Sequence, residues 1–118
     1  MASVDFKQAL TSTRELEITV TGRQSGQQIS LPVWFVHEGD TLYLLPVKGS
    51  DSQWYKNILP KPSMVISARG ATVTVNPKPI TDPSRVQEVV EKFRAKYGAA
   101  DVRRYYSKFG VAVEVRLD

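Results

Sequence analysis

Residues 15–47 read ELEITVTGRQSGQQISLPVWFVHEGDTLYLLPV, and this stretch decides the fold. Its first part, ELEITVT, alternates apolar and polar residues, which is the two-residue period of a strand with one buried face. The turn TGRQSG breaks the pattern, strand character returns over Ile29–His37, and Thr41–Val47 follows the turn EGD. Consecutive strands joined by such short turns predict an antiparallel sheet, with a hairpin around EGD.

The remaining chain adds strands and helices to this sheet. Alternation predicts three further strands, which are Ser63–Ala68, Ala71–Asn76 and Val111–Leu117. Short helical segments are predicted over Val4–Leu10, Asp51–Leu59 and Ala99–Ser107. The only long helix is expected to begin after Asp82, with Pro83 in its first turn, and to end at Gly98. Six strands and one long helix predict a mainly β (α+β) antiparallel barrel with helical additions, in a single domain over residues 1–118.

The composition excludes several classes of function. The chain has no cysteine, which rules out a disulfide framework and a thiolate nucleophile, and His37 is its only histidine, so no metal site is expected. No apolar run approaches a membrane span and no signal peptide is visible, so we expect a cytoplasmic protein. The net charge of +4 is spread along the chain without a nucleic-acid motif, so nucleic-acid binding is not expected. Because no Ser–His–Asp set stands out, a bound cofactor is expected to supply any reactivity.

The turn Thr21–Gly26 has the composition of an anion-binding loop. Gly22 and Gly26 permit backbone conformations that expose amide N–H groups. Arg23 adds a planar charged fork suited to phosphate or carboxylate, and Ser25 adds a hydroxyl donor. The alternative is an ordinary polar hairpin loop, which is favoured for such a turn taken alone.

A second group of candidate residues lies at the start of the following helix. Lys48-Gly49-Ser50 offers a cation, free amides and a helix N-terminus to an anion. Trp54 could wall a planar ring and Asn57 could bond its polar edge, although core packing also explains Trp54. Tyr97, Tyr105 and Tyr106 are candidates for a proton donor, and the last two also for the lining of a substrate pocket, whereas helix packing explains all three without chemistry.

The order of these motifs resembles that of a known family. The series TGR-x-SG, P-V-x-F, GD, KG, WY-x-N and P, spread over residues 21–68, is similar to the deazaflavin-dependent nitroreductase family. That family belongs to the split β-barrel flavin-binding (pyridoxamine phosphate oxidase-like) superfamily. The resemblance implies a split β-barrel, often a homodimer, which binds a reduced 8-hydroxy-5-deazaflavin coenzyme or FMN in a groove. It also implies hydride transfer from the cofactor to a quinone, nitro compound or activated alkene.

The same resemblance assigns ten positions to cofactor binding. The residues that would face the phosphate end of the cofactor are Arg23, Ser25 and Gly26. The residues that would line its ring are Pro32, Val33 and Trp34. The residues at or near its opposite part would be Lys48, Gly49, Trp54 and Asn57.

Two departures from the family pattern motivate a rival hypothesis. Relatives commonly carry Lys directly after the Arg of TGR and Arg three residues after the second glycine, where this chain has Gln24 and Ile29. Losing two cations weakens the hold on a phosphate but leaves an apolar slot, because charge-assisted hydrogen bonds are worth roughly 1.5–3 kcal/mol each. The sequence therefore predicts a deazaflavin- or flavin-dependent oxidoreductase, and as the alternative a non-catalytic split-barrel protein that binds another small ligand.

Overall fold

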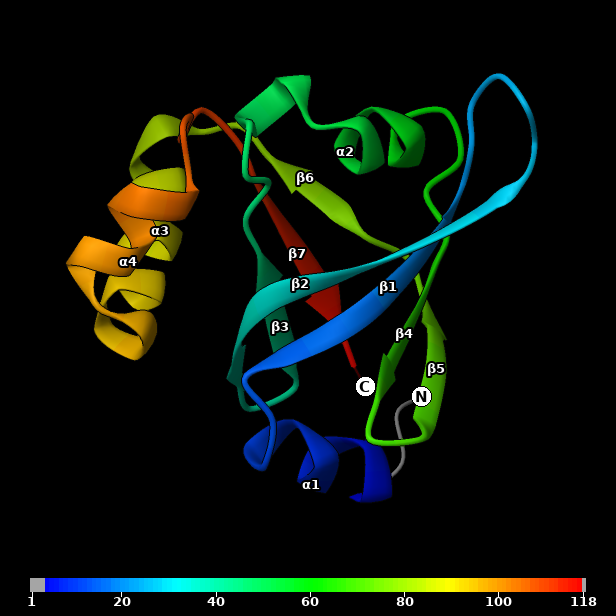
Figure 1. Ribbon diagram of the computed structural model, residues 1–118, viewed down its shortest axis with the longest axis horizontal. Helices are drawn as coiled ribbons and strands as arrows, with labels where there is room; N and C mark the ends of the chain where they lie inside the picture. Colours follow the sequence, from blue (N-terminus) through cyan, green and yellow to red (C-terminus); the bar gives the residue numbers. More distant parts are fainter. Residues whose placement is uncertain (1–3, 118) are drawn as a thin grey trace.

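The computed structural model describes residues 4–117, and within them seven strands form an antiparallel sheet in the order β5-β4-β1-β2-β3-β7-β6. The strands are β1 (Glu15–Thr21), β2 (Gln28–Glu38), β3 (Thr41–Leu44), β4 (Met64–Ala68), β5 (Ala71–Val75), β6 (Lys78–Ile80) and β7 (Ala112–Arg116). Figure 1 shows that the sheet is strongly curled, so that β4 and β5 lie on one side of the barrel and β3 and β7 on the other. This arrangement confirms the predicted α+β split barrel.

Strand β2 joins the two halves of the sheet. Residues 28–34 pair with β1, and the pairing ends where Glu15 lies opposite Trp34. Residues 35–38 pair with β3 instead. The strand partner therefore changes between Trp34 and Phe35. Along residues 28–34, the edge of β2 away from β1 has no strand partner in the described part of the chain.

Within residues 4–117, four α-helices and one 3-10 turn surround the sheet. They are α1 (Val4–Thr11), η1 (Gly49–Asp51), α2 (Gln53–Ile58), α3 (Pro83–Tyr97) and α4 (Ala99–Tyr105). The long helix α3 begins as predicted, because the Asp82 carboxylate accepts a hydrogen bond from the Arg85 amide at 3.1 Å. It ends at Gly98, whose φ is 93°. In Figure 1, α3 and α4 lie together beside β3, while α1 and α2 lie at opposite ends of the barrel.

Two hydrophobic clusters cover the two faces of the sheet. Inside the barrel, strand residues such as Ile18 and Phe35 pack with residues of α1 and α2, including Phe6 and Trp54. Outside it, α3 and α4 pack on β2, β3 and β7 through Val36, Phe93, Tyr97, Tyr106 and their neighbours. Successive residues of β2 thus enter different clusters, because strand side chains alternate between the two faces.

The structure departs from the predicted elements in three places. Strand β6 was not predicted, because it is three residues long, contains Pro79 and is held mainly by pairing with β7. The helix predicted over Asp51–Leu59 is interrupted at Ser52, whose extended backbone separates η1 from α2. The third strand ends at Leu44 rather than Val47. No helix among residues 4–117 is long and apolar enough to cross a membrane.

Candidate functional site

A pocket of about 610 Å³ opens along the unpaired edge of β2. Its lining comes from residues 31–34 of β2, the segment that runs from Leu45 to Trp54, and the end of α4 at Tyr105 and Tyr106. Glu15, directly opposite Trp34 in the sheet, completes it. The volume falls within the range of about 300–1,000 Å³ that is usual for small-molecule sites.

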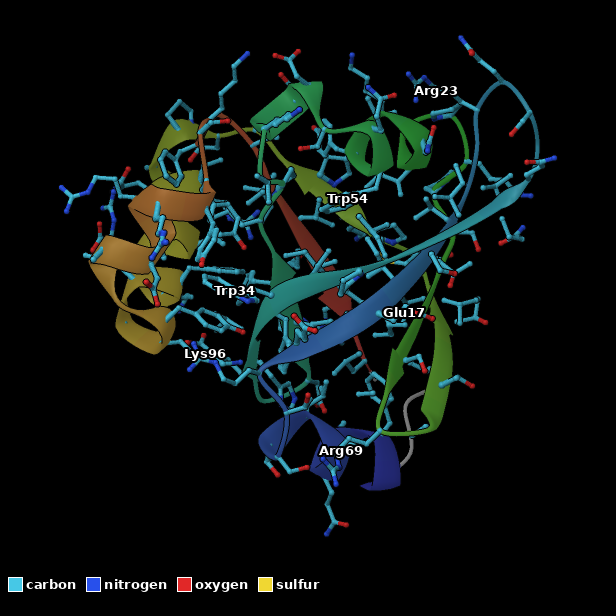
Figure 2. The ribbon with its side chains drawn as sticks, viewed as in Figure 1. Glu17, Arg23, Trp34, Trp54, Arg69 and Lys96 are labelled. Atoms are coloured by element: carbon cyan, nitrogen blue, oxygen red, sulfur yellow. The ribbon has the colours of Figure 1, made fainter. Side chains whose placement is uncertain are left out.

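Aromatic side chains form the walls of this pocket. Trp34 stacks on Tyr97 with ring centroids 4.2 Å apart and an interplanar angle of 7°. The edge of Tyr105 meets Trp34 at 5.5 Å, and Tyr106 lies tilted against it at 5.9 Å. Figure 2 shows Trp34 projecting from β2 toward α3 and α4, with Trp54 below α2. Such walls suit a flat ring system, because aromatic faces favour offset stacking.

Two charged groups of the pocket remain available to a ligand. Asp51 is hydrogen-bonded to Lys108, and that bond holds the pKa of the Asp51 carboxyl below its usual value. The Lys48 ammonium and the Glu15 carboxylate, in contrast, make no hydrogen bond or ion pair with any residue between 4 and 117. The pocket therefore offers one free cation and one free anion, on the segment after β3 and on β1 respectively.

The turn at residues 22–27 is closed by its own hydrogen bonds. The Gly22 amide donates to the Gln27 carbonyl at 2.8 Å, and the Gly26 amide donates to the Gly22 carbonyl at 2.9 Å. The Gln27 amide donates to the Ser25 hydroxyl oxygen at 3.2 Å. The exposed amides that the glycines suggested are thus engaged within the turn. The amides of the two glycines themselves are therefore not available to an anion, whereas the role of the turn as a whole in ligand binding stays a prediction.

Arg23 is held by two neutral amides of α2. Its backbone N–H and its Nη1 both donate to Asn57 Oδ1, at 3.1 and 2.7 Å, and its Nη2 donates to Gln53 Oε1 at 2.9 Å. Neither acceptor carries a charge, so the guanidinium is oriented without being neutralised, and its other N–H donors remain free. Because Gln53 lines the pocket, the bond to its side chain places the guanidinium close to that side of the site. Figure 2 shows Arg23 beside α2.

The structure gathers some of the predicted residues and leaves others outside. The predicted residues that line the pocket are Pro32, Val33, Trp34, Lys48, Trp54, Tyr105 and Tyr106. Those that do not line it are Arg23, Ser25, Gly26, Gly49 and Asn57. A packing reason explains the glycine at position 49, because its φ is +57° and an added Cβ would lie 3.0 Å from the Lys108 Cβ. The roles assigned to these residues in cofactor binding stay predictions.

Sequence reasoning missed Glu15 and Gln53 in this region, and it did not foresee the contact of Tyr97 with Phe35. Glu15 had a usable signal, because counting back through the hairpin from the TGRQSG turn places it opposite Trp34. The contacts of Gln53 and Tyr97 leave no signal in the sequence, because each residue bonds a partner that is distant along the chain. Arg23 is 30 residues from Gln53, and Phe35 is 62 residues from Tyr97.

Comparisons with known proteins place the chain among split-barrel structures. No curated protein sequence matches it. A structure of an F420-H2 dependent reductase (FDR-A) is similar with a TM-score of 0.67 and 18% identity, over 87% of this chain and 94% of that chain. A protein solved as a domain-swapped dimer is similar with a TM-score of 0.66 and 18% identity, over 87% of this chain and 80% of that chain. HutZ, a heme storage protein from Vibrio cholerae, is similar with a TM-score of 0.72 and 12% identity, over 97% of this chain and 88% of that chain.

At these identities the structural likenesses establish a shared fold. The fold accommodates both a reductase and a heme storage protein, so it does not by itself define the ligand. A family model matches residues 7–116, almost the whole chain. The chain therefore belongs to the family described as uncharacterized proteins conserved in bacteria (DUF2255).

Proposed function

We propose that this chain binds a flavin or a deazaflavin in the pocket beside β2 and acts as an oxidoreductase on a small organic acceptor such as a nitro compound or quinone. The observation that carries the proposal is the aromatic slot along the unpaired edge of β2, with Trp34 as its wall. The fold shared with an F420-H2 dependent reductase supports the choice of cofactor class.

The backbone of β2 fits the polar edge of such a ring. The Phe35 N–H donates to the Tyr97 hydroxyl, the Phe35 carbonyl lies 2.9 Å from the same oxygen, and that hydroxyl also lies 2.6 Å from the carbonyl of Arg14, just before β1. Those backbone groups therefore face the β1 side. Because successive residues of a strand direct their backbone groups to opposite edges, the Trp34 N–H and C=O face the pocket. Pro32, on the same edge, contributes a carbonyl and no N–H.

The cations of the site fit a single phosphate. Arg23 and Lys48 are both without a carboxylate partner among residues 4–117, and Gln24 and Ile29 add no further charge. Two cations can neutralise one phosphate group, whereas a longer polyanionic tail needs further cations, which Gln24 and Ile29 do not supply. We therefore propose that FMN suits this chain better than a deazaflavin coenzyme with an acidic tail.

A reduced flavin or deazaflavin supplies a hydride when it is bound. The protein contributes orientation, since Trp34 and Trp54 enclose a flat ring from two segments. Burial raises the pKa of Tyr106, so its hydroxyl stays protonated at neutral pH and can donate a hydrogen bond to an acceptor. Tyr105 is 52% exposed at the same pocket and is the candidate to pass a proton from solvent.

The second candidate function is non-catalytic storage or transport of a small ligand. It is favoured by the closed turn at residues 22–27, in which the amides of Gly22 and Gly26 are engaged, and by the absence of cations at Gln24 and Ile29. An apolar slot that binds anionic groups only weakly suits a flat ligand that is not phosphorylated. The heme storage protein with the same fold supports this alternative.

We also propose that the chain forms a homodimer. Strand β5 is an edge of the sheet, and unpaired strand edges favour association. A protein of the same fold was solved as a domain-swapped dimer, which supports the proposal. Sedimentation velocity at several protein concentrations would test it, and a monomer throughout would contradict it. A cytoplasmic location and a single domain over residues 1–118 stay predictions.

Calorimetric titration with FMN and with the deazaflavin coenzyme tests the cofactor proposal. We expect the wild-type protein to bind at least one of them. The Trp34→Ala variant should bind at least about fivefold more weakly, because an aromatic stack is worth about 1 kcal/mol beyond the area it buries. Thr74→Ala, an exposed change on β5, is the control and should bind like wild type. Absence of binding to both cofactors would contradict the proposal, and binding of heme instead would favour the second candidate.

A further inference from the structure

Tyr97 occupies the point at which β2 changes its strand partner. It is the last residue of α3 and is only 6% exposed. Pairing between β1 and β2 ends at Glu15 and Trp34, so Phe35 has no β1 residue to bond on that side. A buried strand edge that ends in this way needs other partners for its backbone groups. The end of α3 supplies them.

The Tyr97 hydroxyl bonds the backbone of two segments. It accepts a hydrogen bond from the Phe35 N–H at 3.1 Å, and its oxygen lies 2.6 Å from the Arg14 carbonyl and 2.9 Å from the Phe35 carbonyl. Lys96 Nζ also donates to the Phe35 carbonyl, at 2.8 Å. Because that carbonyl already has a donor, the single hydroxyl proton of Tyr97 is left for Arg14. The hydroxyl thus joins α3 to β2 and to the chain entering β1.

The ring of Tyr97 packs directly against Trp34 in the wall of the pocket. It lies almost parallel to Trp34, at 4.2 Å and 7°, and covers one face of the indole. Tyr105 makes a T-shaped contact with Trp34, with ring centroids 5.5 Å apart. Trp34 also lines the pocket, so a ligand ring can reach the part of the indole that Tyr97 does not cover. A bound ring would extend the stack of Tyr97 and Trp34 by one member.

We propose that Tyr97 is the positioning residue of the pocket, and that it holds the Trp34 indole as a fixed platform for one planar aromatic ligand. Its hydroxyl fixes the backbone on either side of Trp34, and its ring fixes the side chain. A platform held in its binding orientation before the ligand arrives raises affinity, because less freedom is lost on binding. The consequence for ligand affinity rests on the proposed function, whereas the fixed orientation of Trp34 does not.

Fluorine NMR of protein labelled with 5-fluorotryptophan tests the fixed orientation without any ligand. The chain has two tryptophans, so Trp54→Phe assigns the two resonances. We expect Tyr97→Phe, which keeps the ring and loses the hydroxyl, to broaden or split the Trp34 resonance and to leave that of Trp54 unchanged. Tyr43→Phe is the matched control, because Tyr43 lies on β3 outside the pocket, and it should alter neither resonance.

FMN titration of the same variants measures the effect on binding. We expect affinity to fall about fivefold in Tyr97→Phe, which corresponds to the loss of one net hydrogen bond, and further in Tyr97→Leu, which also loses the stack. A single sharp Trp34 resonance together with unchanged FMN affinity in Tyr97→Phe would overturn the proposal, even if the variant were less stable. If wild-type protein does not bind FMN, the flavin proposal is weakened while the resonance of Trp34 still decides the role of Tyr97. Concentrated sucrose, which favours compact states, keeps a destabilised variant folded for these spectra.

Discussion

The bonds between Arg23 and Asn57 can be removed by a single substitution. Asn57 is 3% exposed, and its Oδ1 accepts both the backbone N–H and the Nη1 of Arg23. The change Asn57→Ala deletes this shared acceptor and so removes two of the three hydrogen bonds that attach Arg23 to α2. The bond between Arg23 and Gln53 is not touched directly.

The expected loss of stability follows from the two bonds. A neutral hydrogen bond contributes about 1 kcal/mol net and a charged one about 1.5–3 kcal/mol. Arg23 is exposed, so water replaces part of what its guanidinium loses, and the lower end of that range applies. We therefore expect the free energy of unfolding to fall by about 2 kcal/mol. For a chain of 118 residues this corresponds to a decrease in Tm of about 8 °C.

A double-mutant cycle with Arg23→Ala isolates the interaction from the cost of truncating a buried side chain. Urea unfolding of wild type, both single variants and the double variant should give a coupling free energy of about 1.5 kcal/mol. Asn76→Ala, at an exposed asparagine, is the control and should change stability by less than about 0.5 kcal/mol. A coupling free energy near zero would refute the reasoning, because it would mean that Arg23 is not held by Asn57.

Three further predictions concern pH, a glycine and a helix cap. Burial, with a smaller effect of Arg14, lowers the pKa of Lys96 from 10.5 to about 8, so the unfolded chain binds more protons between these values. Urea unfolding of wild type should therefore show stability rising from pH 8 to 9.5 relative to Lys96→Met, and parallel profiles would contradict this. Gly49→Ala should cost on the order of 1–2 kcal/mol by thermal unfolding, because of its positive φ and its contact with Lys108, and an unchanged Tm would count against that contact. Asp82→Ala should cost about 1 kcal/mol and Asp82→Asn much less, since asparagine also caps helices; equal losses would show that the cap bond is unimportant.

The strands of this fold could be predicted because their signal is local. Alternation of Leu16, Ile18 and Val20 places one face of β1 in the core, and all three are buried as expected. Strand β6 lacks such a signal, since a three-residue segment with a proline carries no alternation. It becomes a strand only because β7 offers an edge to pair with.

The candidate site was predicted in part for a similar reason. Trp34, Lys48 and Trp54 line one pocket, and each belongs to a motif that can be recognised in the sequence. The hydrogen bonds of Arg23 to Asn57, and of Tyr97 to Phe35, join residues 34 and 62 positions apart. No local pattern announces such pairs, because they depend on how α2 and α3 pack on the sheet.

Chemical-shift mapping of the isotope-labelled protein tests the central claim most directly, which is that a planar cofactor binds beside the unpaired edge of β2. On titration with FMN or the deazaflavin coenzyme, the indole N–H resonances of both Trp34 and Trp54 should move, together with the backbone amide of Trp34. The amides of β5, at the edge of the sheet, should stay in place. Shifts confined to residues outside the pocket, or no shifts with either cofactor, would contradict the account.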